Sequence, residues 1–381
     1  MHRDRVATRV AFFIAGFGMA AWAPLVPFAK DRAQLNDASL GLLLLCVGVG
    51  SLIMMPITGF LTGRYGCRAV IIAAAAVISI ALPMAATAGS ASLLGVALLL
   101  LGASVGTMDV AMNIQAVIVE KASGEPLMSG FHGLYSVGGI AGAGGVSAFL
   151  SLGGSPLVAV LSVVALIILL VMLAGRDLLG YGSERDGPAF VLPHGPVIFI
   201  GVLCFITFLA EGALLDWSAL FLTAVRDLEP ARAGLGYAAF AVAMTIGRLT
   251  GDRVVAALGR RKILLFGGLL AAAGFFVAIL IPSWVGALAG FVIIGLGASN
   301  IVPVLFTAAG AQTRMPPNLA VAAITTLGYA GILVGPAAIG FISESVGLKT
   351  AFAMVGLSLL LVAASARIAP ARTPVAAASS R

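Results

Sequence analysis

An acid and an amide lie where the sequence surrounds them with apolar residues. The segment GTMDVAMNIQ (106–115) places Asp109 and Asn113 inside the run 92–118, which contains no other charged residue. Gly102, Gly106, Asp109 and Asn113 follow one another at spacings of three and four, so they share one face of a helix. An acid inside an apolar helix normally faces a protein interior or a water-filled cavity and is commonly functional. We therefore predict that Asp109 couples to protons and that Asn113 contacts a solute.

Three more ionisable residues join this candidate site. His132 shares a helix face with Tyr135, and we expect it at a depth similar to that of Asp109, where it can share a proton; a hydrogen bond to a backbone carbonyl is the alternative. Glu211 and Asp216 are five residues apart, about 140° around a helix, so they face different ways. We assign Glu211, with His132, to proton coupling. Asp216 is either a substrate contact or the partner of a neighbouring helix.

Two tryptophans and a second amide complete the set. Trp22 and Trp217 occupy equivalent positions in the first and seventh predicted spans, where each could stack on a ligand or anchor its helix at the membrane interface. Asn300 is a neutral hydrogen-bonding group whose alternative role is to join two helices. We place all three, with Asn113 and Asp216, among the substrate-binding candidates.

The composition requires a bilayer around these residues. Of the 381 residues, 61% are hydrophobic and 10% are charged, and the mean hydropathy is +1.13; an ordinary soluble domain is about 25% charged. A helix needs about 20 mainly apolar residues to cross the hydrocarbon. We predict an all-α membrane protein with transmembrane helices at residues 6–29, 39–63, 68–88, 92–118, 127–152, 156–175, 195–225, 231–256, 262–281, 284–310, 318–345 and 349–368.

The basic residues set the expected orientation. With the N-terminus in the cytoplasm, 17 of the 22 Lys and Arg residues fall on the cytoplasmic side, so the positive-inside rule predicts that both termini are cytoplasmic. A nucleic-acid binder would instead gather its basic residues on one exposed face. The net charge of +7 is therefore explained by membrane topology, and we expect no nucleic-acid partner.

The chain divides near its middle. Residues 176–194 are polar and rich in Gly and Pro, and we predict that they form a cytoplasmic linker between two six-helix bundles, residues 1–175 and 195–381. The halves also repeat features in the same order: Trp22 and Trp217 are 195 residues apart, and so are the two GAS segments at 102–104 and 297–299. Parallel repeats of this kind are a known transporter architecture.

Two segments carry a family resemblance. GFLTGRYGCR (59–68), and GRLTGDR with GRRK within 247–262, resemble the two copies of the loop signature of the major facilitator superfamily. GTMDVAMN, FHGLYSVGG (131–139) and EGALLDWSALFL (211–222) further resemble a bacterial branch near the fucose-permease-like proteins. The resemblance implies a secondary transporter whose two six-helix bundles enclose a central cavity and work by alternating access.

The resemblance also implies a gate. Where the first signature usually has an acid this chain has Gly63, which places the usual charge relay there in doubt, whereas the second copy keeps Asp252, four residues after Arg248. By pseudo-symmetry we expect Asp252 at the N-terminal end of the fifth span, where the exposed amides favour a carboxylate. We predict that Arg248 and Asp252 form the gate; a solvated ion pair without a gating role is the alternative.

Missing motifs narrow the function. No Walker loop or compact metal motif is present, and we expect no enzyme activity, no cofactor and no metal. The central parts of spans one, four, seven and ten lack Lys and Arg, so an anionic substrate would lack its usual ligands. We predict a monomeric transporter of the bacterial inner membrane that moves a small neutral polar solute, such as a sugar, with protons. The alternatives are a proton-coupled exporter of cationic or hydrophobic compounds and a transport-inactive receptor on the same fold.

Overall fold

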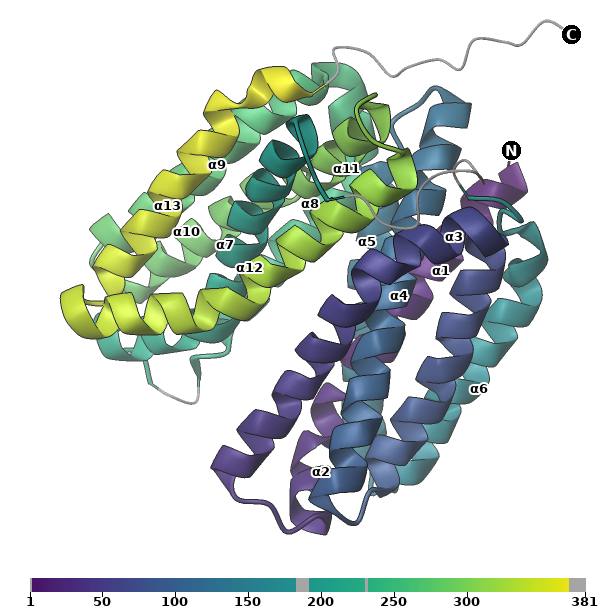
Figure 1. Ribbon diagram of the computed structural model, residues 1–381. Coiled ribbons are helices and arrows are strands. Elements are labelled where there is room, and N and C mark those ends of the chain that lie inside the picture. Colours follow the sequence, from purple (N-terminus) through teal and green to yellow (C-terminus); the bar gives the residue numbers. More distant parts are fainter. Residues whose placement is uncertain (1, 183–191, 230–231, 370–381) are drawn as a thin grey trace, which may run out of the picture. The chain divides into compact units, whose positions relative to one another are not determined.

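Every regular element in the described part of the computed structural model is a helix (Figure 1). It describes residues 2–182, 192–229 and 232–369. In the part of the chain before the central linker the helices are α1 (His2–Ala20), η1 (Ala23–Leu25), α2 (Val26–Arg32), α3 (Asp37–Thr87), α4 (Ala91–Ser123), α5 (Met128–Ser151), α6 (Pro156–Ala174) and η2 (Gly175–Asp177). After the linker they are α7 (Pro196–Arg226), α8 (Leu235–Leu258), α9 (Arg260–Leu280), α10 (Trp284–Ala298), α11 (Ile301–Ala311), α12 (Pro317–Val346), α13 (Leu348–Ala364) and η4 (Ala366–Ile368).

These helices supply twelve membrane spans. Nine spans in the described ranges are long and apolar enough to cross a membrane when α1 with α2, and α10 with α11, are each taken as one. One of the nine, α3, has 51 residues and at 1.5 Å per residue is more than twice as long as the hydrocarbon is thick. It breaks at Gly66, whose φ of +82° suits glycine, so it contains two of the predicted spans. The charged helix α8 and the 17-residue apolar helix α13 complete the twelve.

The chain forms two compact units, which we describe separately. The first unit comprises Met1–Val119, Leu134–Leu192 and Pro316–Ala322, and the second comprises Glu120–Gly133, Pro193–Met315 and Ala323–Arg381. The short segment 120–133 belongs to the second unit although it precedes the linker, and the short segment 316–322 belongs to the first unit although it follows the linker. Residues 183–191 of the predicted linker lie outside the described residues.

Glycine allows the closest helix packing in the first unit. A Cβ atom on Gly102 of α4 would collide with the backbone of Val47 in α3, and one on Gly106 would lie 2.7 Å from the Cα of Ser51. The Ser51 hydroxyl donates to the Gly102 carbonyl at 2.8 Å. This contact fixes the rotation of α4, the helix that carries Asp109. In the second unit, α9 packs against α10 and α13, and α10 also packs against α8.

Two spans that the sequence predicted as continuous are interrupted. α1 ends at Ala20 and a turn precedes η1, because Pro24 lacks the N–H that would continue the helix and its ring would clash with the preceding turn. α10 ends at Ala298 and α11 begins at Ile301, with Pro303 in the first turn of α11. The interruptions lie at Trp22 and Asn300, both of which are candidate site residues.

Candidate functional site

In the first unit, Asp109 and Asn113 form a hydrogen-bonded pair on α4. The Asn113 amide donates to the backbone carbonyl of Asp109 at 2.8 Å and to its Oδ1 at 3.3 Å. Asn113 is fully buried and Asp109 is half-buried. Among the described residues, Oδ1 of Asn113 has no hydrogen-bond partner. The shared helix face that we predicted is therefore confirmed, and the amide keeps one acceptor available beside the acid.

Trp22 lies in the first unit, at the break between α1 and η1. Only 4% of the residue is exposed, which does not fit a side chain at a lipid-facing surface. Its indole Nε1 has no hydrogen-bond partner within the described ranges. A buried Trp usually satisfies this N–H. The unsatisfied donor agrees better with the predicted ligand contact than with a membrane-interface anchor.

In the second unit, Glu211 of α7 forms an ion pair with Arg248 of α8. Nη2 of Arg248 lies 3.1 Å from Oε1 and 3.3 Å from Oε2 of Glu211. Only 8% of the Arg248 side chain and 17% of the Glu211 side chain are exposed. The sequence predicted Glu211 as a proton-coupling acid and Arg248 as a gate residue, but it did not predict their contact. An arginine is long enough to reach a neighbouring helix, so helical spacing alone did not identify its partner.

This pair also qualifies one sequence inference. The seventh span contains no basic residue near Glu211, yet α8 places a guanidinium beside it. A charge buried in an apolar helix requires a partner, and Arg248 within the otherwise apolar first part of α8 was the available signal. The central parts of spans one, four, seven and ten lack Lys and Arg, but a neighbouring helix can still place a cation beside them.

The other two candidates on α7 differ in exposure. Asp216 is exposed, whereas Glu211 is partly buried, in agreement with the prediction that the two acids face different ways. Trp217 is half-buried, and its ring lies over Gly340 of α12, where an added Cβ would be 3.3 Å from the ring. Its Nε1 has no hydrogen-bond partner in the described part of the chain. Like Trp22, Trp217 therefore presents an unsatisfied donor. The ligand roles of Asp216 and Trp217 stay predictions.

Asn300 joins two helices. It is buried between α10 and α11, and its amide donates to the Gly247 carbonyl of α8 at 3.1 Å and to the Ser299 hydroxyl at 2.9 Å. A Cβ on Gly251, one turn further along α8, would collide with the Asn300 side chain. These contacts provide the helix-joining role that was the alternative for this residue. A substrate contact by Asn300 stays a prediction.

Asp252 lies at the N-terminal end of α5, as the sequence predicted. Its Oδ1 accepts a hydrogen bond from the backbone N–H of Gly130 at 3.0 Å, and an added Cβ on Gly130 would collide with the carboxylate. Both residues belong to the second unit. In the first unit, the Asn318 amide near the start of α12 donates to the carbonyl of Gly59 at 2.7 Å. Both loop signatures therefore contact the beginning of a helix, one through a carboxylate and the other through a carbonyl.

Sequence reasoning missed a second carboxylate at the start of α5. Glu120, at the end of α4, accepts hydrogen bonds from the N–H groups of Leu127 at 2.8 Å and Met128 at 2.9 Å. It also bonds Nη2 of Arg260 at 3.1 Å and the Thr307 hydroxyl at 2.6 Å. We call Glu120, Arg260, Thr307 and these two N–H groups the Glu120 clasp. The sequence analysis did not select Glu120 as a site residue, and it included Arg260 only as part of GRRK.

His132 belongs to the second unit, whereas Asp109 belongs to the first. The His132 side chain is buried, and its ring centroid lies 5.6 Å from that of Phe306 in α11. This contact supports packing of the imidazole within the second unit. Proton sharing between His132 and Asp109 stays a prediction.

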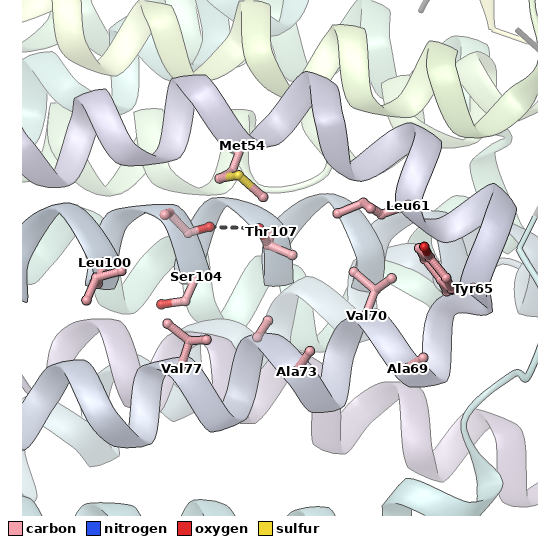
Figure 2. A pocket seen from close by; sticks show the side chains of 12 residues that line it. Met54, Leu61, Tyr65, Ala69, Val70, Ala73, Val77, Leu100, Ser104 and Thr107 are labelled. Atoms are coloured by element: carbon pink, nitrogen blue, oxygen red, sulfur yellow. Dashed lines mark hydrogen bonds between the residues drawn. The ribbon is translucent and has the colours of Figure 1, made fainter. Parts of the chain in front are cut away.

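The first unit also contains an apolar cavity between α3 and α4, with a volume of about 470 Å³ (Figure 2). None of the predicted proton-coupling, substrate-binding or gate residues lines it. The cavity is therefore separate from the candidate site described above.

Comparisons with known proteins place the chain among transporters. The family model of the Major Facilitator Superfamily matches residues 200–381. An uncharacterized MFS-type transporter of Yersinia pestis is 62% identical over 365 residues, which cover 96% of this chain and 95% of that protein. The membrane protein MosC of Rhizobium meliloti is 34% identical over 92% of this chain and 86% of its own length. A variant of the E. coli fucose:proton symporter FucP has the same fold, with a TM-score of 0.82, 17% identity and coverage of 95% of this chain and 97% of that chain.

Proposed function

This chain belongs to the major facilitator superfamily, and from that premise we propose that it moves a small neutral polar solute, such as a sugar, by proton-coupled alternating access. Transport of a solute across a membrane is the part supported by its relatives, one of which is an MFS-type transporter at 62% identity. The class of solute and the use of protons are our proposal. FucP, which has the same fold, is a fucose:proton symporter, so this fold accommodates both.

The observation that carries proton coupling is the half-buried carboxyl group of Asp109, which bonds to a fully buried amide in a helix that has no other charged residue between positions 92 and 118. A proton on this carboxyl removes the charge, and an uncharged group is far less costly to enclose. If the two facings of the transporter bind that proton with different affinity, a proton gradient shifts the population between them. We therefore propose that Asp109 is the residue that couples proton binding to solute movement.

The polar groups left unsatisfied favour a neutral hydroxyl compound. Oδ1 of Asn113 is an acceptor and Nε1 of Trp22 is a donor, and within the described ranges neither has a partner. A hydroxyl group can both donate and accept hydrogen bonds, so a polyol can satisfy both kinds of group. In the second unit Glu211 already neutralises Arg248. That pair therefore does not require a charged solute for compensation.

The Glu120 clasp and Asp252 suit a gate on the cytoplasmic side. In the predicted orientation the connection between α4 and α5 is cytoplasmic, and its residues 120–133 belong to the second unit although α4 begins in the first. Two carboxylates hold N–H groups at the start of α5. We propose that these bonds form when the cytoplasmic side is closed and break when it opens. The protein would act as a monomer in a bacterial inner membrane with both termini cytoplasmic.

Proteoliposomes test this proposal. A thermal-shift screen of the purified protein against neutral sugars and polyols, and against organic cations, first finds a ligand, because a compound that binds only the folded state raises its apparent stability. With that ligand, the wild-type protein should accumulate solute when a proton gradient is imposed. Asp109→Asn should lose accumulation but keep exchange of labelled for unlabelled solute, whereas Asp31→Asn, at an exposed position on α2 of the same unit, serves as the matched control.

Three results would contradict the proposal. Stabilisation by many cations, with uptake driven out of acidic vesicles, would favour the exporter. Ligand binding without flux in either direction would favour the receptor. Undiminished gradient-driven accumulation by Asp109→Asn would remove Asp109 from the coupling mechanism.

A further inference from the structure

The cavity between α3 and α4 is lined by none of the residues that we assign to solute transport. Three stretches of chain line it: Met54 to Tyr65 in the first part of α3, Ala69 to Val77 in its second part, and Leu100 to Thr107 in α4. Figure 2 shows their side chains converging from three sides, with Tyr65 at one end. Small residues, among them Ala69, Ala73 and Ala103, create the space. Its volume of about 470 Å³ lies in the range of ligand sites.

The lining offers almost nothing to a polar molecule. Its hydroxyl groups at Ser104 and Thr107 each donate to a carbonyl of their own helix, Leu101 and Ala103, at 2.8 Å. They therefore present mainly carbon to the cavity, and the remaining lining atoms are those of Met, Leu, Val, Ala and Tyr side chains. A sugar would leave its hydroxyl groups unpaired there, at a cost that burial of apolar area would not offset. The lining therefore favours a hydrocarbon chain as the occupant.

The cavity has the length of one leaflet. Met54 and Tyr65 are eleven residues apart on one helix, which corresponds to about 16 Å along its axis. Half of the hydrocarbon core measures about 15 Å. Tyr65 is exposed and lies next to the break at Gly66, where α3 turns back. A chain that entered beside Tyr65 would therefore reach the bilayer midplane near Met54.

The charges at the entrance indicate which molecule carries the chain. GFLTGRYGCR contains two arginines and no acid. Arg68 is engaged with the carbonyls of Leu178 and Arg176 at 2.9 and 2.5 Å, whereas Arg64 is exposed with its guanidinium 5.6 Å from the centre of the Tyr65 ring. An exposed arginine at the membrane surface attracts the anionic lipids of the cytoplasmic leaflet. We propose that the cavity binds an acyl chain of an anionic phospholipid, with Arg64 beside its phosphate.

Native mass spectrometry of the full-length protein tests this site with dioleoyl phosphatidylglycerol and with phosphatidylcholine of the same chains. The delipidated wild-type protein should retain one phosphatidylglycerol more tightly than phosphatidylcholine. Ala73→Phe fills the cavity and should weaken that binding about tenfold, whereas Ala76→Phe, on the same helix but outside the lining, should not. Arg64→Gln should reduce the preference for phosphatidylglycerol about fivefold, whereas the exposed Arg9→Gln should leave it unchanged.

Equal retention by Ala73→Phe and Ala76→Phe, or equal retention of the two lipids by the wild type, would overturn the proposal. So would displacement of the lipid by free oleate at the same concentration, because the site would then recognise a fatty acid. If Ala73→Phe fails to fold, the wild type still decides: a phosphatidylglycerol with a diazirine in its acyl chain should label peptides that contain residues 54–77 and 100–107. Labelling confined to α9 or α13 would place the bound lipid elsewhere.

Discussion

The backbone N–H of Gly130 donates to Oδ1 of Asp252 at 3.0 Å, so a loop signature of the second half holds the start of a helix from the first half. Gly130 leaves no room for a side chain at this contact, since a Cβ would collide with the carboxylate. A negative charge is favoured at the end of a helix where N–H groups are exposed. The contact therefore links the charge on Asp252 to the position of α5.

We expect Asp252→Asn to weaken the interaction with the N-terminal end of α5, because the amide keeps an acceptor but loses the charge. The loss should be about 1 kcal/mol, which would increase cysteine accessibility from the cytoplasmic side and decrease it from the outside. Thiol-labelling rates of single cysteines on each side measure the change. Glu229→Gln is the control, because that side chain is 67% exposed and forms a surface ion pair with Arg232. An unchanged ratio of the two rates would show that Asp252 does not bias the gate.

We expect Glu120→Gln to destabilise the folded protein. The Glu120 and Arg260 side chains are only 3% and 4% exposed, and removing one partner of a buried ion pair typically costs about 3–5 kcal/mol. The apparent melting temperature should fall clearly, and the double variant with Arg260→Gln should be less destabilised than the sum of the single variants. Glu125→Gln, in the exposed connection to α5, should change the apparent melting temperature little. Additive effects in the double variant would mean that the two residues do not act as a pair.

We expect the two residues of the Glu211–Arg248 pair to depend on each other in the same way. Glu211→Gln leaves a buried guanidinium uncompensated, and Arg248→Gln leaves a buried carboxylate uncompensated, so each single variant should lower stability and transport. Glu211→Gln with Arg248→Gln removes both charges and should recover part of the stability. Thermal unfolding and solute exchange measure the two effects. Recovery of stability without recovery of exchange would assign the pair a role in transport beyond packing.

Opposite effects are expected from alanine at two glycines. Gly102→Ala forces a methyl group into the backbone of Val47, and overpacking of this kind costs about 1–3 kcal/mol. Gly145→Ala, on α5, meets nothing within 4 Å and should stabilise its helix by up to about 1 kcal/mol. Unfolding of both variants in the same detergent gives the difference. A destabilisation by Gly145→Ala as large as that by Gly102→Ala would show that the close approach of α3 and α4 is not responsible.

Helical spacing predicted correctly what happens within one helix. The bond between Asn113 and Asp109 joins residues four apart on α4, and the separation of Glu211 from Asp216 follows from their five-residue spacing. The Asp252 position was also predicted, but through the repeat of the loop signature. Contacts of long side chains were not predictable in this way. Arg248 reaches α7, and Arg260 reaches the end of α4, 140 residues away in sequence.

The sequence by itself determined the bilayer setting, the twelve spans, the shared face of Asp109 and Asn113 and the different faces of Glu211 and Asp216, because hydrophobicity and the 3.6-residue period are local properties of the chain. Only the tertiary structure decided which helices those faces meet. It pairs Glu211 with Arg248, assigns Asn300 to the packing of α8, and gathers the Glu120 clasp from three separate segments. The physical reason is that a buried charge or amide takes its partner from whichever neighbouring helix packs against it, and that packing depends on the shape of the whole unit.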